Sequence, residues 1–512
     1  MARSNRKQFV VNAAWGWLAQ ISFIITGIIL IPYAISRLGE NEYGFFQLGR
    51  SSIAIFMFLQ LGMAPTLIRF CSQAIAARNR SEIAEISTTA QLLLGVLGLV
   101  GMAIGLALIP LFIRFYEVPA SLVSETQGML VCMALSLFVN FLFIVPHGIV
   151  LGANRHDSAN ILNIIYNCLG LALIIVLFEQ IRPSLFFFGL SMLIMQLIRL
   201  MGMFCLAAKY AGREVFFSFK KISKSTFHKM AGFGSLSFIN TIAATVVFQG
   251  PVMVIGKFLG EEAVTAFAPA LLVSQSLAGL LGRISSPLVP LASREIEKNS
   301  GVRLGQLATR AGQVVGIIGF SVTVPFCVFG REIAHLWLGP DLSWTWGVVA
   351  VMSTGIAISQ IQGVNYHLAL GGGSIKPVVI SQVIMAVIVV TGTTLGTLYW
   401  DWGILAVASF IGVCIFLRNT LYLVYAYSKQ FGYRFFVYQW KVYIQPMIVT
   451  LFCIGVGYSV KAIVRSDNPF VLAGCLLVVM SLFFSLNWVF VVPEEMKSLL
   501  PVGRIGKLFR SK

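Results

Sequence analysis

The sequence predicts an all-α membrane protein with fourteen transmembrane helices, arranged as two pseudo-symmetric six-helix lobes followed by two C-terminal helices. Three observations lead to this prediction: a very apolar composition, fourteen apolar runs of membrane-spanning length, and an internal repeat of about 220 residues. The 512 residues are 58% hydrophobic and 11% charged, against about 25% charged residues in an ordinary soluble domain. So little charge cannot cover a soluble surface, which excludes soluble enzymes, nucleic-acid-binding proteins and disordered scaffolds.

The apolar runs each approach or exceed the roughly 20 residues that a helix needs to cross the bilayer core. Only α-helices fit, because the alternation of barrel strands is absent and lipid requires internally hydrogen-bonded backbones. The first run follows a basic N-terminus without a small-residue cleavage site, so we expect a retained span rather than a removed signal peptide. The predicted spans cover residues 10–36, 44–68, 86–112, 128–151, 159–178, 184–207, 230–256, 264–291, 307–329, 346–370, 378–398, 403–427, 442–464 and 469–492.

The loops between these spans differ in charge. With the N-terminus in the cytoplasm, cytoplasmic segments hold 26 of the 37 Lys and Arg residues, outer loops hold seven, and four lie within spans. The positive-inside rule therefore predicts that both termini are cytoplasmic. The net charge of +18 is then loop charge, and we expect no nucleic-acid partner.

Other patterns argue against an enzyme. The outer loops are too short for a folded catalytic domain, which needs at least about 50 residues. The eight cysteines lie in or beside apolar runs and form neither a Cys-x-x-Cys pair nor a Cys/His cluster. No nucleotide-binding Gly-x-x-x-x-Gly-Lys-Ser/Thr loop occurs in the sequence. We therefore expect a transporter with no metal and no cofactor.

An internal repeat organises the chain. Six spans per copy is an even number, so both copies keep the same orientation and form two lobes about an axis along the membrane normal. Transporters of this kind bind substrate between the lobes and alternate access by rocking them. The matches are Leu38-Gly39-Glu40 with Leu259-Gly260-Glu261, His147 with His367, and Arg199 with Arg418. We predict lobes at residues 1–208 and 230–428, a cytoplasmic inter-lobe linker at 209–229, and two further helices with a basic cytoplasmic tail at 429–512.

Two motifs carry a family resemblance. Residues 32–44 (PYAISRLGENEYG) and 59–70 (LQLGMAPTLIRF) are similar to the first-loop and second-span motifs of bacterial polysaccharide and O-antigen flippases. The spans, repeat and linker resemble the wider multidrug/oligosaccharidyl-lipid/polysaccharide exporter superfamily over nearly the whole chain. The resemblance implies movement of undecaprenyl-pyrophosphate-linked oligosaccharide from the cytoplasmic to the periplasmic leaflet of a bacterial inner membrane. It also implies membrane lipids, a polysaccharide polymerase and chain-length machinery as candidate partners.

A second reading stays open within the same superfamily, namely a multidrug antiporter driven by protons or sodium ions. Many such exporters carry a carboxylate inside a span. In this chain every Asp and Glu falls in a loop or at a predicted helix end. The absence of a deep carboxylate from the sequence argues against the antiporter, although acids at helix ends, such as Glu40, Glu42 and Asp157, could couple an ion or simply cap helices.

Four arginines within spans are the main candidates for substrate contact: Arg50, Arg199, Arg283 and Arg418. A central arginine costs roughly 2.5–3.5 kcal/mol on insertion scales, and such a cost is tolerable where the side chain lines a water-filled cavity. A cationic cavity attracts an anionic head group, and the guanidinium fork binds phosphate oxygens bidentately. The predicted substrate group is the pyrophosphate of a lipid carrier.

The alternative for each arginine is snorkelling or a structural role. Arg50 lies about 9 Å from the outer end of its span, and Arg283 and Arg199 lie roughly 12 Å from their inner ends. Arg283 follows Gly279 and Gly282 and precedes Pro287, so we expect a bent helix around it and rank it first. Arg199 and Arg418 are repeat mates that contact substrate or, as we favour, stabilise the cytoplasmic mouth.

Uncharged polar residues and prolines complete the candidate site. Amides offer both a donor and an acceptor to sugar hydroxyls, although amides in bundles also bond to neighbouring helices. The candidate sugar contacts are Asn240, Gln249, Gln20 and Gln60, of which the first two lie near the Gly250-Pro251 break. Prolines that interrupt spans are candidate hinges or merely tolerated kinks. They are Pro32, Pro65, Pro146, Pro251 and Pro287.

Overall fold

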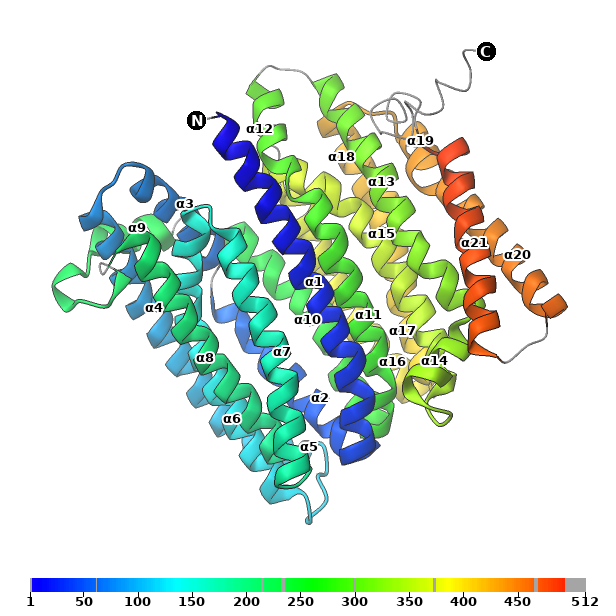
Figure 1. Ribbon diagram of the computed structural model, residues 1–512, viewed down its shortest axis with the longest axis horizontal. Coiled ribbons are helices and arrows are strands. Elements are labelled where there is room, and N and C mark those ends of the chain that lie inside the picture. The colour runs from blue at the N-terminus through cyan, green and yellow to red at the C-terminus, as the bar shows by residue number, and fades with distance from the viewer. Residues whose placement is uncertain are drawn as a thin grey trace. The chain divides into compact units, whose positions relative to one another are not determined.

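The computed structural model describes residues 2–60, 62–212, 215–231, 235–297, 301–371, 374–464 and 468–492. All regular secondary structure in these ranges is helical, with no strand among them (Figure 1). Thirteen helices there are long and apolar enough to cross a membrane, or fourteen if one bent pair counts as a single span. The predicted all-α polytopic class is therefore confirmed.

The bent pair corresponds to the predicted second span. Helix α2 (Glu40–Ile55) continues into the 3-10 turn η1 (Phe56–Gln60) and meets α3 (Met63–Ala76) at 43°. Gly62 adopts a left-handed conformation with φ 69°, which a residue with a side chain rarely takes. The break therefore falls where the sequence supplies a glycine, three residues before Pro65.

The chain divides into two compact units. The first comprises Met1–Ala268 and Gln382–Ile404, and the second comprises Pro269–Ser381 and Leu405–Lys512. The lobe boundaries predicted from the repeat remain predictions.

Unit 1 is centred on α6, which packs along α8 and also contacts α4 and α3. Close approach depends on small residues, because a Cβ at Gly98 of α4 would lie 2.9 Å from the Cβ of Phe141 on α6. Phe141, Leu94 and Leu137 are buried at this contact. The helices of this unit not yet given are α1 (Ala2–Leu38), α4 (Arg80–Ala107), α5 (Ile109–Phe115), α6 (Val123–Gly152), α7 (His156–Gln180), α8 (Leu185–Ala211), η3 (Phe219–Lys221), α9 (Lys224–Ala231), α10 (Ser235–Phe258), the start of α11 (Glu261–Ser285) and most of α16 (Lys376–Tyr399).

Unit 2 is centred on the pair α13 and α15. Gly319 of α13 again permits the approach, since a Cβ there would lie 3.0 Å from the Cβ of Ala357 on α15. Two π-helical turns, η5 (Leu417–Tyr422) and η6 (Gln439–Ile444), interrupt the later helices. The remaining elements are α12 (Leu288–Glu297), α13 (Gly301–Val328), α14 (Gly330–Leu338), η4 (Ser343–Thr345), α15 (Trp346–Leu370), α17 (Ile404–Phe416), α18 (Leu423–Phe431), α19 (Phe435–Tyr438), α20 (Gln445–Val464) and α21 (Pro469–Phe490).

The repeated Leu-Gly-Glu motif marks equivalent helix junctions. Gly39 and Gly260 have φ values of 93° and 87°, each between the end of one helix and the start of the next. The glutamates that follow lie in the first turns of α2 and α11. A carboxylate in the first turn interacts favourably with the helix dipole, which gives Glu40 and Glu42 a capping position.

Candidate functional site

The structure divides the four predicted arginines into two kinds. Arg199 and Arg418 have partners within their own units. Arg50 and Arg283 have no such partners among the described residues.

Arg199 on α8 is held between two aromatic rings of unit 1. Its guanidinium carbon lies 4.1 Å from the centre of the Phe143 ring and 5.0 Å from that of Tyr166. One terminal nitrogen donates a hydrogen bond of 2.9 Å to Asn163 Oδ1, while Nε is buried without a partner. Cation–π contacts of this kind stabilise a guanidinium away from water. The arrangement gives Arg199 a structural place among α6, α7 and α8.

Arg418 is held by hydrogen bonds within unit 2. It lies in the π-helical turn η5, and its Nε donates to Ser381 Oγ at 2.9 Å. Its terminal nitrogens donate to the Val378 carbonyl at 3.3 Å and to Asn419 Oδ1 at 3.4 Å. These bonds tie η5 to α16, as expected of a structural arginine.

Arg50 lies on a polar stripe of α2. Tyr43, Gln47 and Arg50 are spaced i, i+4 and i+7, so they share one face of the helix. The buried Gln47 donates a hydrogen bond of 2.9 Å to the Tyr43 hydroxyl. Arg50 is exposed, and in the described part of the chain its side chain has neither a hydrogen bond nor an ion pair. Its charge is therefore available to an anion.

Arg283 lies near the C-terminal end of α11, in its last turn. The side chain is partly buried, and its Nε is enclosed without a hydrogen-bond partner. The expected interruption is present immediately after it, because α11 ends at Ser285 and α12 begins at Leu288, with Pro287 between them. A buried guanidinium nitrogen without a partner is costly, and an anionic ligand would satisfy it.

The predicted sugar contacts also differ in their surroundings. Gln60 donates to Asn140 Oδ1 at 3.3 Å, which is the interhelical bond considered as its alternative. Gln20 is buried. Asn240 on α10 has a buried Oδ1 without a partner, and Gln249 on the same helix is partly exposed. Their roles in sugar binding remain predictions.

The predicted hinges fall at two kinds of position. Pro32, Pro146 and Pro251 lie inside α1, α6 and α10, which continue through them. Pro65 and Pro287 lie beside breaks, the first within α3 after the 43° bend and the second between α11 and α12. Any hinge motion at the five prolines remains a prediction.

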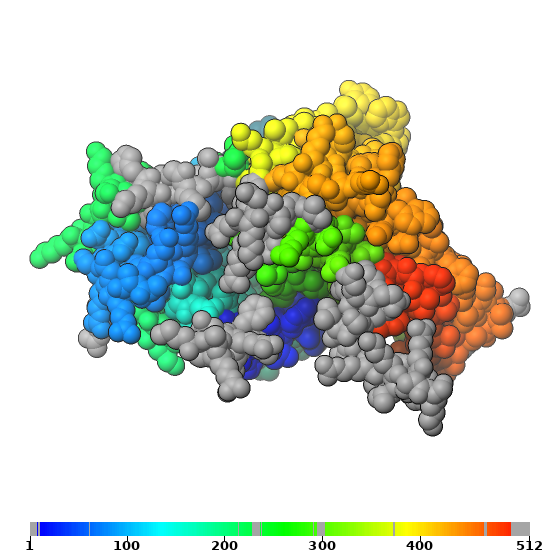
Figure 2. All heavy atoms as spheres, turned by 90° about the horizontal axis from the view of Figure 1, so that it is seen from above, coloured from blue at the N-terminus to red at the C-terminus, as the bar shows by residue number. Residues whose placement is uncertain are grey.

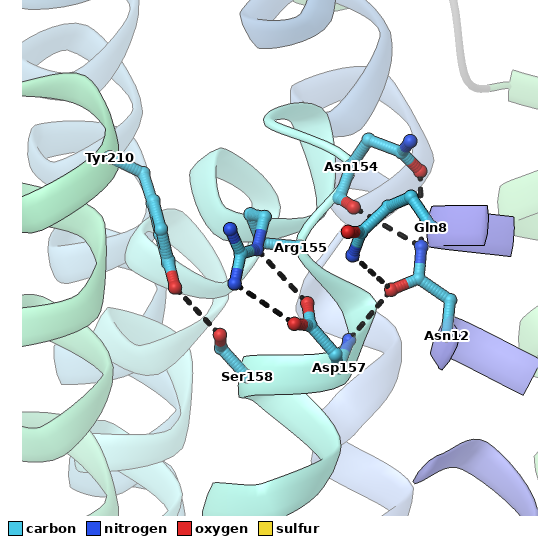
Figure 3. A network of polar contacts seen from close by, with 7 residues as sticks. All are labelled: Gln8, Asn12, Asn154, Arg155, Asp157, Ser158 and Tyr210. Carbon is cyan, nitrogen blue, oxygen red and sulfur yellow. Dashed lines mark hydrogen bonds and ion pairs between the residues drawn. The ribbon is translucent and has the colours of Figure 1, made fainter. Parts of the chain in front are cut away.

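Asp157, which the sequence left open between coupling and capping, belongs to a polar network at the start of α7 (Figure 3). One carboxylate oxygen accepts a hydrogen bond from Arg155 Nε at 3.1 Å, and the other accepts one from a terminal nitrogen of the same guanidinium at 2.9 Å. Its backbone N–H donates to Asn12 Oδ1 at 3.0 Å, and Asn12 donates to the carbonyl of Asn154 at 3.1 Å. The network links α1 to the α6–α7 turn, which gives Asp157 a structural function.

Four cations of the predicted outer loops are paired with carboxylates in the structure. At the fully exposed Glu117, the Lys257 ammonium lowers the pKa of the carboxyl group. These pairs neutralise charge at the end of the bundle where the positive-inside rule predicts little net positive charge. They are Arg37 with Glu179, Arg182 with Glu125 at 3.2 Å, Lys257 with Glu117 at 2.9 Å, and Lys461 with Glu332 at 2.6 Å.

Sequence reasoning missed a buried polar cluster in unit 2. Gln362 donates to the Tyr443 hydroxyl at 2.9 Å, and Asn365 donates to Gln362 Oε1 at 2.8 Å and to the Tyr438 hydroxyl at 3.1 Å. Tyr443 in turn donates to the backbone carbonyl of Asn419 in η5 at 3.3 Å. The π-helical turns that bring these groups together have no clear sequence signal. Among the described residues no group of three or more His, Cys, Asp or Glu could hold a metal ion.

Comparisons with known proteins agree with this architecture. The MatE family model matches residues 17–176. The chain is 21% identical to the "Uncharacterized membrane protein EpsK" of Bacillus subtilis (strain 168) over 469 residues, covering 90% of this chain and 91% of that protein. The fold of this chain is similar to that of the lipid II flippase MurJ in its inward closed conformation. The TM-score is 0.70 and the identity 12%, and the match covers 94% of this chain and 98% of the MurJ chain.

The fold is also similar to an inward-facing multidrug resistance MATE family transporter of the MOP superfamily. That comparison has a TM-score of 0.68 and 14% identity, and it covers 83% of this chain and 98% of the other. The chain is therefore a polytopic membrane protein with the fold of MOP-superfamily transporters, as the resemblance in its sequence implied. The same fold is thus shared by a MATE family transporter and by the lipid II flippase MurJ, so the fold alone does not distinguish between them.

Proposed function

We propose that this protein flips an undecaprenyl-pyrophosphate-linked oligosaccharide, a precursor of polysaccharide or O-antigen, from the cytoplasmic to the periplasmic leaflet of a bacterial inner membrane. Transport would proceed by alternating access, with the anionic head group attracted to cationic side chains. The observation that carries the proposal is the pair of arginines within spans, Arg50 and Arg283, for which the described residues supply no counter-charge.

The chemistry of these side chains suits a lipid pyrophosphate. A guanidinium is permanently charged and presents a planar fork of donors that matches phosphate oxygens. Arg50 is the eleventh residue of α2 and Arg283 the twenty-third of α11, so by helix rise they lie about 15 Å and 33 Å from the starts of their helices. In the predicted topology Arg283 would then meet the head group near the cytoplasmic end, and Arg50 nearer the outer end.

The fold by itself is equally compatible with a multidrug antiporter. What favours the flippase is charge. Each described Asp or Glu in a candidate span lies within six residues of the end of its helix, and Asp157 is already paired with Arg155. A site for cationic drugs or for proton exchange needs a carboxylate deep in a span, whereas the deepest unpaired charge in the described spans is the cation Arg50, inside the bent span that begins at Glu40, and Arg283 adds a second cation in the last turn of α11. Unpaired cations favour an anionic substrate.

The test is complementation of a deletion strain. Arg283→Ala and Arg50→Ala proteins should accumulate normally in the membrane, fail to restore polysaccharide export, and leave lipid-linked oligosaccharide trapped on the cytoplasmic leaflet. Arg283→Lys should restore export only in part, since it keeps the charge and loses the bidentate fork. Normal export by the Arg283→Ala protein would refute the assigned contact, and an unchanged lipid distribution in the deletion strain would refute the proposed substrate.

A further inference from the structure

The segment between α8 and α10 is unusually apolar and basic for a connection between spans. Residues 215–227 contain four phenylalanines and three lysines and no Asp or Glu. All four phenylalanines are exposed, with Phe216 at 52%, Phe217 at 39%, Phe219 at 78% and Phe227 at 39%. Large exposed aromatic groups gathered beside cations are typical of surfaces that bind a partner or a membrane. We call residues 215–227 the strap.

The strap is fixed to unit 1 and is not a free tether. It turns back from α8 at Gly212, whose φ of 89° favours glycine, and lies beside α4 (Figures 1 and 2, in green next to the blue α3–α4 end). A run of buried polar residues on α4 hydrogen-bonds its backbone. Ser87 and Gln91 both donate to the Val215 carbonyl at 2.6 Å, the Ser218 N–H donates to Thr88 at 3.3 Å, and the Ser223 N–H donates to Thr89 at 3.2 Å.

Lys221 reaches from the strap toward the start of α4. The strap backbone bonds to α4 at Thr88 and Thr89, eight and nine residues after its first residue, Arg80. Lys221 Nζ instead donates to Ser81 Oγ at 3.3 Å, at the very start of α4. By helix rise the ammonium is thus about 10 Å nearer the helix end than the backbone that carries it. Lysines extend in this way when their stems lie at the membrane boundary and their charges seek the head-group layer.

The surroundings of the strap are also mainly cationic. Arg78, in the α3–α4 turn, and Arg80, the first residue of α4, are exposed at the helix end that Lys221 reaches. The strap itself adds Lys220, Lys221 and Lys224. Two carboxylates, Glu82 and Glu85, lie on the facing part of α4. The Glu82 carboxylate accepts a hydrogen bond of 3.1 Å from the Asn79 amide, and the Glu82 backbone N–H donates to Asn79 Oδ1 at 3.2 Å. Among these described residues, five cations stand against two carboxylates, so the immediate surroundings of the strap carry a net positive charge.

We propose that the strap is a binding surface for anionic phospholipid, with Phe216, Phe217 and Phe219 inserted among the lipids at the boundary and Lys220, Lys221 and Lys224 on the phosphate groups. An anionic leaflet suits the combination, because aromatic side chains enter the interfacial region while lysines gain from its negative potential. The predicted topology places this end at the cytoplasmic leaflet. The proposal does not depend on which substrate the protein carries.

Hydrogen–deuterium exchange of the full-length protein in nanodiscs tests the proposal. In discs that contain phosphatidylglycerol, peptides of the strap should exchange on the order of tenfold more slowly than in pure phosphatidylcholine, and high salt should remove the difference. The triple substitution Lys220→Gln, Lys221→Gln, Lys224→Gln should abolish this lipid dependence. The matched control, Lys376→Gln, Lys429→Gln, Lys441→Gln, removes the same charge from other predicted cytoplasmic segments and should preserve it.

A photoreactive benzophenone amino acid in place of Phe219 identifies what covers the strap. In native membranes we expect it to crosslink to phospholipid. Equal exchange in the two kinds of disc, an equal effect of the two triple substitutions, or crosslinking to another protein instead of lipid would each overturn the proposal. Exchange in α6 peptides reports whether the variants are folded, so that a misfolded variant is not mistaken for a loss of lipid binding.

Discussion

Replacing Arg199 by alanine separates a structural arginine from a substrate-binding one. The substitution removes a 2.9 Å hydrogen bond to Asn163 and ring contacts at 4.1 Å and 5.0 Å with Phe143 and Tyr166. A hydrogen bond to a charged group contributes about 1.5–3 kcal/mol, and a cation–π contact about 0.5–2 kcal/mol. Removal of a buried charge offsets part of this loss, so we expect the free energy of unfolding to fall by about 2–4 kcal/mol.

The assay is reversible unfolding of the purified protein in mixed detergent micelles, followed by tryptophan fluorescence. A loss of 2 kcal/mol corresponds to a roughly 30-fold shift in the unfolding equilibrium, which this measurement resolves. Arg199→Met fills similar space without the charge, so it should lower the free energy of unfolding by less than half as much as Arg199→Ala does. The matched control is Arg283→Ala, which removes no hydrogen bond to the described residues and should change stability by only about 0.5 kcal/mol.

The reasoning about Arg199 would be refuted by the opposite pattern. If Arg199→Ala protein unfolds like the wild type and yet fails in export, its guanidinium contacts substrate and the aromatic enclosure is incidental. If Arg283→Ala is instead the strongly destabilised variant, the assignment of Arg283 to the anion site loses its basis.

Two further predictions concern packing and the network at the start of α7. Gly44→Ala places a Cβ against the backbone carbonyl of Glu261, so it should destabilise the protein by about 1–3 kcal/mol in the same unfolding assay. The control Gly455→Ala, where nothing lies within 4 Å of the added Cβ, should be neutral or slightly stabilising. Equal effects of the two substitutions would contradict this. Asp157→Asn weakens the ion pair with Arg155 and should lower the free energy of unfolding by about 0.5–1.5 kcal/mol. Arg155→Lys should lower it by a similar amount, because lysine cannot form the paired hydrogen bonds. No change in either variant would show that the network is not stabilising.

Much of the fold could be predicted because it depends on local composition. A run of about 20 apolar residues in a membrane must be helical whatever it packs against, so helix number and type follow from the chain alone. The same holds for the junctions at Gly39 and Gly260, where glycine and a following glutamate mark the stop and start of helices. The sequence also sufficed to name the four arginines, since a charge in an apolar run is conspicuous.

Which arginine lacks a partner could not be predicted. Arg199 and Arg50 look alike in the sequence, and the aromatic rings that enclose Arg199 come from helices more than 30 and 50 residues away in the chain. The strap shows the same limit, because the buried Ser87-Thr88-Thr89 run appears in the sequence only as polar residues within a span. Contacts between distant segments depend on which helix faces meet, and periodicity is too weak in helices that are apolar all round to specify those faces.

The sequence by itself therefore determined the membrane class, the helical architecture and the excess of positive charge within the spans. Only the tertiary structure decided which of those charges have partners. It gave Arg199 and Arg418 partners from neighbouring helices and left Arg50 and Arg283 without a counter-charge among the described residues. The physical reason is that the cost of burying a charge is set by the groups that surround it in space, and only folding brings those groups together.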